Sequence, residues 1–65
     1  MKIIEELSDM IEEELGDAEK YINCAAKVKK EDRSLADTFY LLSNEEMEHA
    51  AILHDQVMAI IVYCS

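Results

Sequence analysis

Hydrophobic residues recur along residues 2–30 with the spacing of a helix that buries one stripe. Positions three and four apart lie on the same face of an α-helix, and a sustained run of them forms a heptad seam. Here the seam runs through Ile4, Leu7, Ile11, Glu14, Ala18, Tyr21, Ala25 and Val28. Only Glu14 departs from the apolar or amphipathic pattern, and the opposite face is charged. The pattern predicts an amphipathic helix from about residue 2 to residue 30.

A second seam with the same spacing follows in residues 33–63. It runs through Leu35, Phe39, Leu42, Glu46, His49, Leu53, Gln56, Ile60 and Tyr63. Glu46 and His49 interrupt this seam near its middle, and Gln56 interrupts it further on. The pattern predicts a second helix over residues 33–63.

The segment between the two seams, residues 29–33, consists of charged residues. Its two lysines suit the C-terminus of a helix, and Asp32 or Ser34 can cap the start of the next one. Ser34 and Asp37 also have the spacing of a capping box. Because the chain has no proline and one glycine, a single continuous helix is the alternative. We favour a helical hairpin with its turn at residues 31–32, since a charged segment between two clean seams suits a short turn.

The polar interruptions of the two seams meet in such a hairpin. A turn at residues 31–32 brings residue n level with residue 63 − n, so Glu14 lies level with His49. Glu46 lies one helical turn nearer the hairpin turn, on the same face as His49. Buried charges cost several kcal/mol each unless they are paired or bind a metal. The sequence therefore predicts a cation among Glu14, Glu46 and His49.

One hairpin supplies three ligands and leaves its inner seam half covered. Two copies related by a two-fold axis bring together four Glu and two His residues, the ligand set of carboxylate di-metal bundles. Carboxylate and imidazole ligands suit iron or manganese, and the thiolates of a structural zinc site are missing from the set. We therefore predict an all-α fold. An antiparallel helical hairpin dimerises into a four-helix bundle, as a homodimer or a higher homo-oligomer.

The composition limits the remaining possibilities. A chain of 65 residues forms a single domain, residues 1–65, which is marginally stable alone. Its formal net charge of −9 disfavours nucleic acid and anionic membranes as partners and is compatible with attracting cations. The longest apolar run, from Val57 to Tyr63, is far shorter than a membrane span, and the N-terminus turns acidic at once, unlike a signal peptide. We expect a cytoplasmic protein.

Two segments resemble the ferritin-like di-iron carboxylate superfamily. They are Glu14-x6-Tyr21 in the first helix and Asn44-Glu45-Glu46-Met47-Glu48-His49-Ala50 in the second. Over about residues 14–57 the chain is similar to rubrerythrin-type bundles and to encapsulated ferritins, and it carries a single half of the bundle, as encapsulated ferritins do. The resemblance implies that Glu14, Glu46 and His49 are iron ligands, that Tyr21 lies beside the site, and that two chains form one bundle. It also adds the interior of a protein compartment as an alternative location.

The expected function is oxidation of ferrous iron by dioxygen or peroxide, in iron storage or detoxification, with Glu14, Glu46 and His49 as the catalytic metal ligands. Manganese is the alternative metal. The alternative function is a non-catalytic dimeric helical bundle for interaction or scaffolding, with a structural metal. Tyr21 either packs in the core or lies beside the ligands. Glu45, about 100° round the helix from Glu46, is either a surface residue or approaches the site from its rim.

Overall fold

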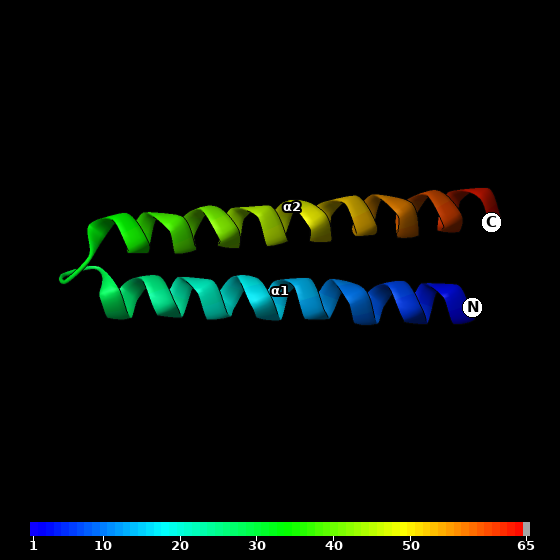
Figure 1. Ribbon diagram of the computed structural model, residues 1–65. Coiled ribbons are helices and arrows are strands. Elements are labelled where there is room, and N and C mark those ends of the chain that lie inside the picture. Colours follow the sequence, from blue (N-terminus) through cyan, green and yellow to red (C-terminus); the bar gives the residue numbers. More distant parts are fainter. Residues whose placement is uncertain (65) are drawn as a thin grey trace.

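The computed structural model describes residues 1–64 as two antiparallel helices joined by a short turn (Figure 1). Helix α1 spans Lys2–Val28 and helix α2 spans Arg33–Cys64. The hairpin is long and thin, with principal extents of 52 × 14 × 9 Å. The prediction of an all-α hairpin is confirmed for the described residues.

The turn occupies residues 29–32, because α1 ends at Val28, two residues earlier than expected. The backbone N–H groups of Glu31 and Asp32 both donate to the carbonyl oxygen of Val28, at 3.0 and 2.8 Å. The side chain of Asp32 then caps α2 by accepting a hydrogen bond from the N–H of Leu35 at 3.0 Å. Asp32 is thus the cap, and Asp37 pairs with Arg33 at 3.3 Å instead of closing a capping box with Ser34.

The seam predicted for α1 faces α2. Each of its eight positions is buried or half-buried, whereas most of the positions between them are exposed. Ala18 and Ala25 are the most deeply buried residues of α1. The periodicity of the apolar residues was therefore sufficient to set the rotation of α1 about its axis.

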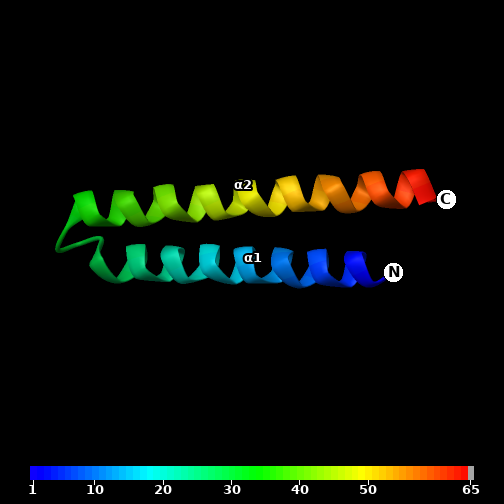
Figure 2. The same ribbon diagram turned by 45° about the vertical axis from the view of Figure 1, so that its right-hand side comes forward.

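The seam predicted for α2 was wrong at four of its nine positions. Small residues face α1 instead: Ala36, Ser43 and Ala50 are buried. Of the predicted positions, Leu35, His49, Gln56 and Tyr63 are exposed, while Phe39, Leu42, Glu46, Leu53 and Ile60 remain half-buried. Helix α2 extends beyond the start of α1 (Figure 2), and Tyr63, the second-last residue of α2, is 89% exposed.

The physical reason is the close approach of the two helices. Short side chains on both helices let the backbones come near enough for the Ser43 hydroxyl to donate to the carbonyl oxygen of Ala18 at 3.0 Å. Leucine in the same row would hold the helices apart. The row of small residues therefore takes the interface between the helices, so Leu35 is exposed and Leu42 is only half-buried.

This row of small residues divides the hairpin into two long faces. Ala18 lies between Glu14 and Leu15 on the circumference of α1, and Ala50 lies between Glu46 and Met47 on α2. The site face comprises Ile3, Leu7, Met10, Glu14, Asp17, Tyr21, Cys24 and Val28 with Leu35, Phe39, Leu42, Glu46, His49, Leu53, Gln56 and Ile60. The back face comprises Ser8, Leu15 and Ile22 with Arg33, Tyr40, Met47, His54 and Ile61.

Two further features of residues 1–64 bear on the sequence expectations. Neither helix contains a stretch that is both apolar enough and long enough to cross a bilayer. Cys24 is half-buried, Cys64 is exposed, and both are free thiols.

Candidate metal centre

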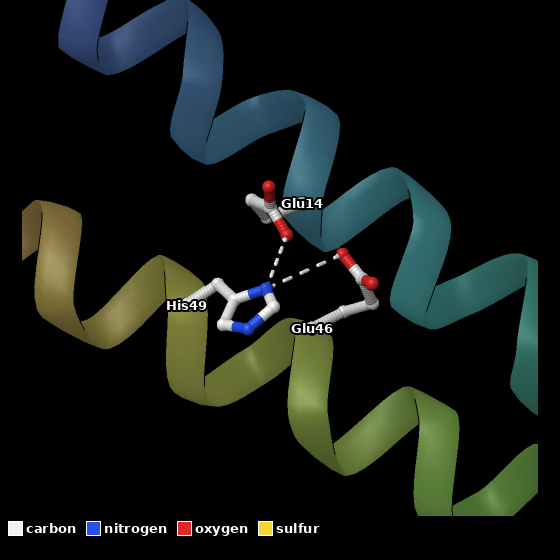
Figure 3. Close-up of side chains that lie close together, drawn as sticks. All are labelled: Glu14, Glu46 and His49. Carbon is white, nitrogen blue, oxygen red and sulfur yellow. Dashed lines mark hydrogen bonds and ion pairs between the residues drawn. The ribbon is translucent and has the colours of Figure 1, made fainter.

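Glu14, Glu46 and His49 come together near the middle of the hairpin (Figure 3). The Nδ1 atom of His49 lies 3.3 Å from Oε2 of Glu14 and 4.0 Å from Oε2 of Glu46. One ligand atom from each of the three residues lies within 4.8 Å of the other two. The convergence expected from the two seams and the turn is therefore present in the structure of a single chain.

Simple helix geometry produces this convergence. Glu46 and His49 are three residues apart on α2, so both point to the same side of that helix. Glu14 comes from α1, level with His49, where the antiparallel pairing brings the two helices side by side. The Glu14 and Glu46 side chains are only 27% and 20% exposed, whereas His49, at the outer edge of the site face, is 56% exposed.

The two carboxyl groups are electrostatically linked. A hydrogen bond between them raises the pKa of Glu46, and desolvation and the negative charge of Glu14 act in the same direction. The same hydrogen bond lowers the pKa of Glu14, and the nearby His49 adds to this effect against the opposing influence of desolvation. In the metal-free chain the pair thus holds one proton on Glu46 more tightly than an ordinary glutamate does.

Asp17 is a third acidic group at this site that the seams did not predict. Its negative charge also raises the pKa of Glu46. Asp17 follows Glu14 by one helical turn, so the spacing i, i+3 was the signal that could have identified it. Together with Glu13 and Lys20 it borders an open hollow of about 390 Å³ on α1, next to Glu14. The surroundings of the three residues are therefore negatively charged.

The donor set fits a divalent transition metal. Ligand atoms that each lie about 2.1 Å from a shared ion are at most about 4.2 Å apart. The observed limit of 4.8 Å is close to this value, so a small rotation of a carboxylate would be enough. The group contains two carboxylates and one imidazole and no thiolate, because neither Cys24 nor Cys64 belongs to it. Such a set suits iron or manganese better than a structural zinc ion.

The other candidate residues lie outside this group. The ring of Tyr21 stacks on Phe39 with centroids 6.2 Å apart, so Tyr21 packs within the hairpin two helical turns from Glu14. Glu45 is exposed. His54 is exposed on the back face, with its Nδ1 4.0 Å from Oδ1 of Asp55. The structure thus brings together three of the five residues proposed for the site, all of them proposed ligands.

Comparison of the chain with protein families, with curated proteins and with solved structures gives no match.

Proposed function

We propose that two copies of this hairpin pack through their site faces and together hold a pair of iron ions, which they oxidise from the ferrous to the ferric state. The observation that carries this proposal is the convergence of Glu14, Glu46 and His49 at the middle of a largely apolar face. Iron is the substrate in this proposal, and dioxygen or peroxide is the oxidant. The ferritin-like resemblance of the two segments is consistent with it.

The site face supports the pairing of two copies. Apolar residues flank the three polar ones along its length, and several of them, including Ile3, Met10 and Leu35, remain exposed in one hairpin. Covering them removes apolar surface from water and stabilises a dimer at roughly 25 cal/mol for each Å² buried. Because the three polar residues lie near the middle of the hairpin, two copies with their turns at opposite ends can overlap along most of their length.

Charge balance supports the binding of cations by such a dimer. The site face of each copy brings Glu14, Glu46 and Asp17 towards the partner, and like charges repel each other strongly when they are removed from water. Divalent ions would neutralise the carboxylates, and four carboxylates with two histidines match the ligand set of di-metal bundles. A dimer without cations would instead have to keep Glu46 protonated.

The residues of this chain have distinct roles in the proposed reaction. Glu14 and His49 hold the ferrous ion, and Glu46 releases its proton as the ion binds. Each ferrous ion then loses one electron, and the oxidant takes up the electrons together with protons. Anionic carboxylate ligands favour this change because they stabilise the higher charge of the ferric product more than that of the ferrous substrate.

The test is anaerobic addition of ferrous ion to the purified protein, followed by exposure to air. Loss of ferrous ion, followed with a ferrous chelator, and uptake of dioxygen should both run well above the rates in buffer alone. A protein that binds the metal with no faster oxidation would be the structural alternative, a metal-stabilised scaffold. A protein that binds neither ferrous nor manganous ion would refute both functions.

A further inference from the structure

The back face of the hairpin is largely apolar, interrupted by Ser8, Arg33 and His54, although it lies opposite the site face. Leu15, Ile22, Tyr40, Met47 and Ile61 are each between 38% and 49% exposed on it. Packing two hairpins through their site faces leaves these residues on the outside of the bundle. Outer faces of helical bundles are normally polar, so a row of large apolar residues there marks an interaction surface.

The apolar residues of the back face are arranged to receive another helix. Leu15 and Ile22 are seven residues apart on α1, and Tyr40 and Met47 are seven residues apart on α2. The pairing of the two helices brings Leu15 level with Met47 and Ile22 level with Tyr40. Residues 2–22 of α1, which make three heptads, extend about 31 Å at 1.5 Å per residue. A third helix of that length would rest on both α1 and α2.

One edge of the back face carries a regular row of negative charge. Glu5, Glu12 and Glu19 are exposed, and they are seven residues apart on α1. Each lies just outside the apolar row on the same helix. The corresponding edge of α2 carries one charge, on Asp37, which pairs with Arg33, and is uncharged at Asn44, Ala51 and Met58. We call Glu5, Glu12 and Glu19 the acidic rim.

The acidic rim argues against a second copy of this chain on the back face. The chain has six basic residues against fifteen acidic ones, and α2 has a single basic residue, Arg33, at its first position. The remaining basic residues are concentrated around the turn, with Lys20 and Lys2 elsewhere on α1. The exposed surface of the hairpin therefore offers no row of positive charges that could match the rim.

We propose that the back face binds an amphipathic helix of another protein, whose apolar stripe is bordered on one side by lysine or arginine residues. The stripe packs against Leu15, Ile22, Tyr40 and Met47, and the basic border lies along the acidic rim. Such helix-in-groove binding draws its affinity from the apolar contacts and its orientation from the charges. It is independent of the metal centre, because the two faces lie on opposite sides of the hairpin.

The experiment uses a synthetic helical peptide of roughly three heptads, with leucines along one stripe and lysines along one edge. A matched peptide carries glutamates in place of the lysines. Binding to the full chain is followed by fluorescence anisotropy of the labelled peptide. The lysine peptide should bind at micromolar concentration and weaken as salt is raised, and the glutamate peptide should bind at least about tenfold more weakly.

Two sets of variants locate the binding surface. Leu15→Ser combined with Met47→Ser should weaken binding about tenfold or more, whereas Leu41→Ser, at an exposed leucine outside both faces, should leave it unchanged. Glu12→Gln combined with Glu19→Gln should weaken binding and reduce its salt dependence, while Glu48→Gln should do neither. The glutamine variants change only exposed side chains, so they keep the test valid if the serine variants unfold.

Three results would overturn the proposal. The first is that neither peptide binds, or that both bind equally. The second is that the Leu15→Ser, Met47→Ser variant stays folded by circular dichroism and binds the lysine peptide as wild type does. The third is an assembly larger than a dimer that these two substitutions break down, because a second copy would then occupy the back face.

Discussion

The two long faces of the hairpin, the site face and the back face, share the same heptad arrangement but differ in where their charged residues lie. Both consist of side chains at heptad spacing on either side of the same row of small residues, and both expose apolar surface. On the site face the charges of Glu14 and Glu46 lie within the apolar surface, whereas on the back face the charges of the acidic rim lie beside it. A charge within a covered face must find a countercharge, but a charge at the rim stays hydrated. The site face is thus suited to bind cations, and the back face to bind a partner with a matching edge.

Removing a ligand tests this contrast with the largest expected effect. Glu46→Ala and Glu14→Ala should each reduce the rate of ferrous oxidation by about 100-fold or more, because each removes a proposed ligand of the ferrous ion. The rate is measured as loss of ferrous ion under air. Glu48→Ala, at an exposed carboxylate on α2, and Leu15→Ser, on the back face, serve as controls and should keep the wild-type rate. A comparable loss in either control would remove the distinction between the faces.

The row of small residues supports both faces, so crowding it should affect the whole hairpin. Ala25→Leu inserts a branched side chain where Ala25 has no exposed surface, and it should lower the free energy of unfolding by about 2 kcal/mol. Ala26→Leu, one residue further on and exposed, should change it by no more than about 0.5 kcal/mol. Urea denaturation of both variants measures the difference. Equal values would mean that the two helices do not approach each other closely at Ala25.

Replacing a histidine on each face should give different results in the metal-free protein. His49→Leu puts an apolar side chain on a face that becomes buried in the dimer, so the metal-free protein should gain about 1 kcal/mol of stability or at least lose none. His54→Leu puts the same side chain on the outward back face, where the change should stay within about 0.5 kcal/mol. Thermal melts without metal test this. A marked loss of stability in His49→Leu would mean that its contact with Glu14 outweighs the burial of leucine.

The smallest expected effect is the dependence of metal-free stability on pH. Because the pKa of Glu46 is raised, Glu46 stabilises the folded protein at low pH. This stabilisation is lost as pH rises through the raised pKa. Because the pKa of Glu14 is lowered, Glu14 stabilises the folded protein above the ordinary glutamate pKa. This stabilisation is lost as pH falls through the lowered pKa. The pair therefore stabilises the protein most between these two pKa values.

Urea midpoints at a series of pH values check this dependence. Glu46→Gln, which mimics the protonated side chain, should remove the loss of stability on the alkaline side of the window. An unchanged pH profile in Glu46→Gln would show that the two carboxyl groups are not linked. With metal bound, stability should instead increase as pH rises through the mildly acidic range, since protons and metal ions compete for Glu46.

The amount of structure that could be predicted from sequence differs between the two helices. In α1, charged residues surround a single apolar stripe, so only one rotation of the helix buries it. In α2, apolar residues occur on several sides, and hydrophobicity alone favoured Leu35 and Leu42 over Ala36 and Ser43. The deciding factor was side-chain size at the close contact with α1, which a polarity pattern does not encode.

The three proposed ligands were predictable for a different reason. The spacing of Glu46 and His49 on α2 fixes the distance between them along the helix, and the position of the turn sets Glu14 level with His49. Neither depends on which side of α2 faces α1. Their exposure was not predictable, because the rotation of α2 places His49 at the edge of the site face. Asp17 was missed because it lies beside the predicted seam of α1 and not on it.

In the proposed dimer, each chain carries half of a metal centre that two chains complete. Sedimentation of the wild type and of Glu46→Ala, with and without manganous ion under air and with ferrous ion under anaerobic conditions, tests it most directly. We expect a wild-type dimer that metal tightens by about tenfold or more, one bound ion per chain, and no effect of metal on Glu46→Ala. A folded wild-type monomer that persists at micromolar concentration with excess metal would contradict it.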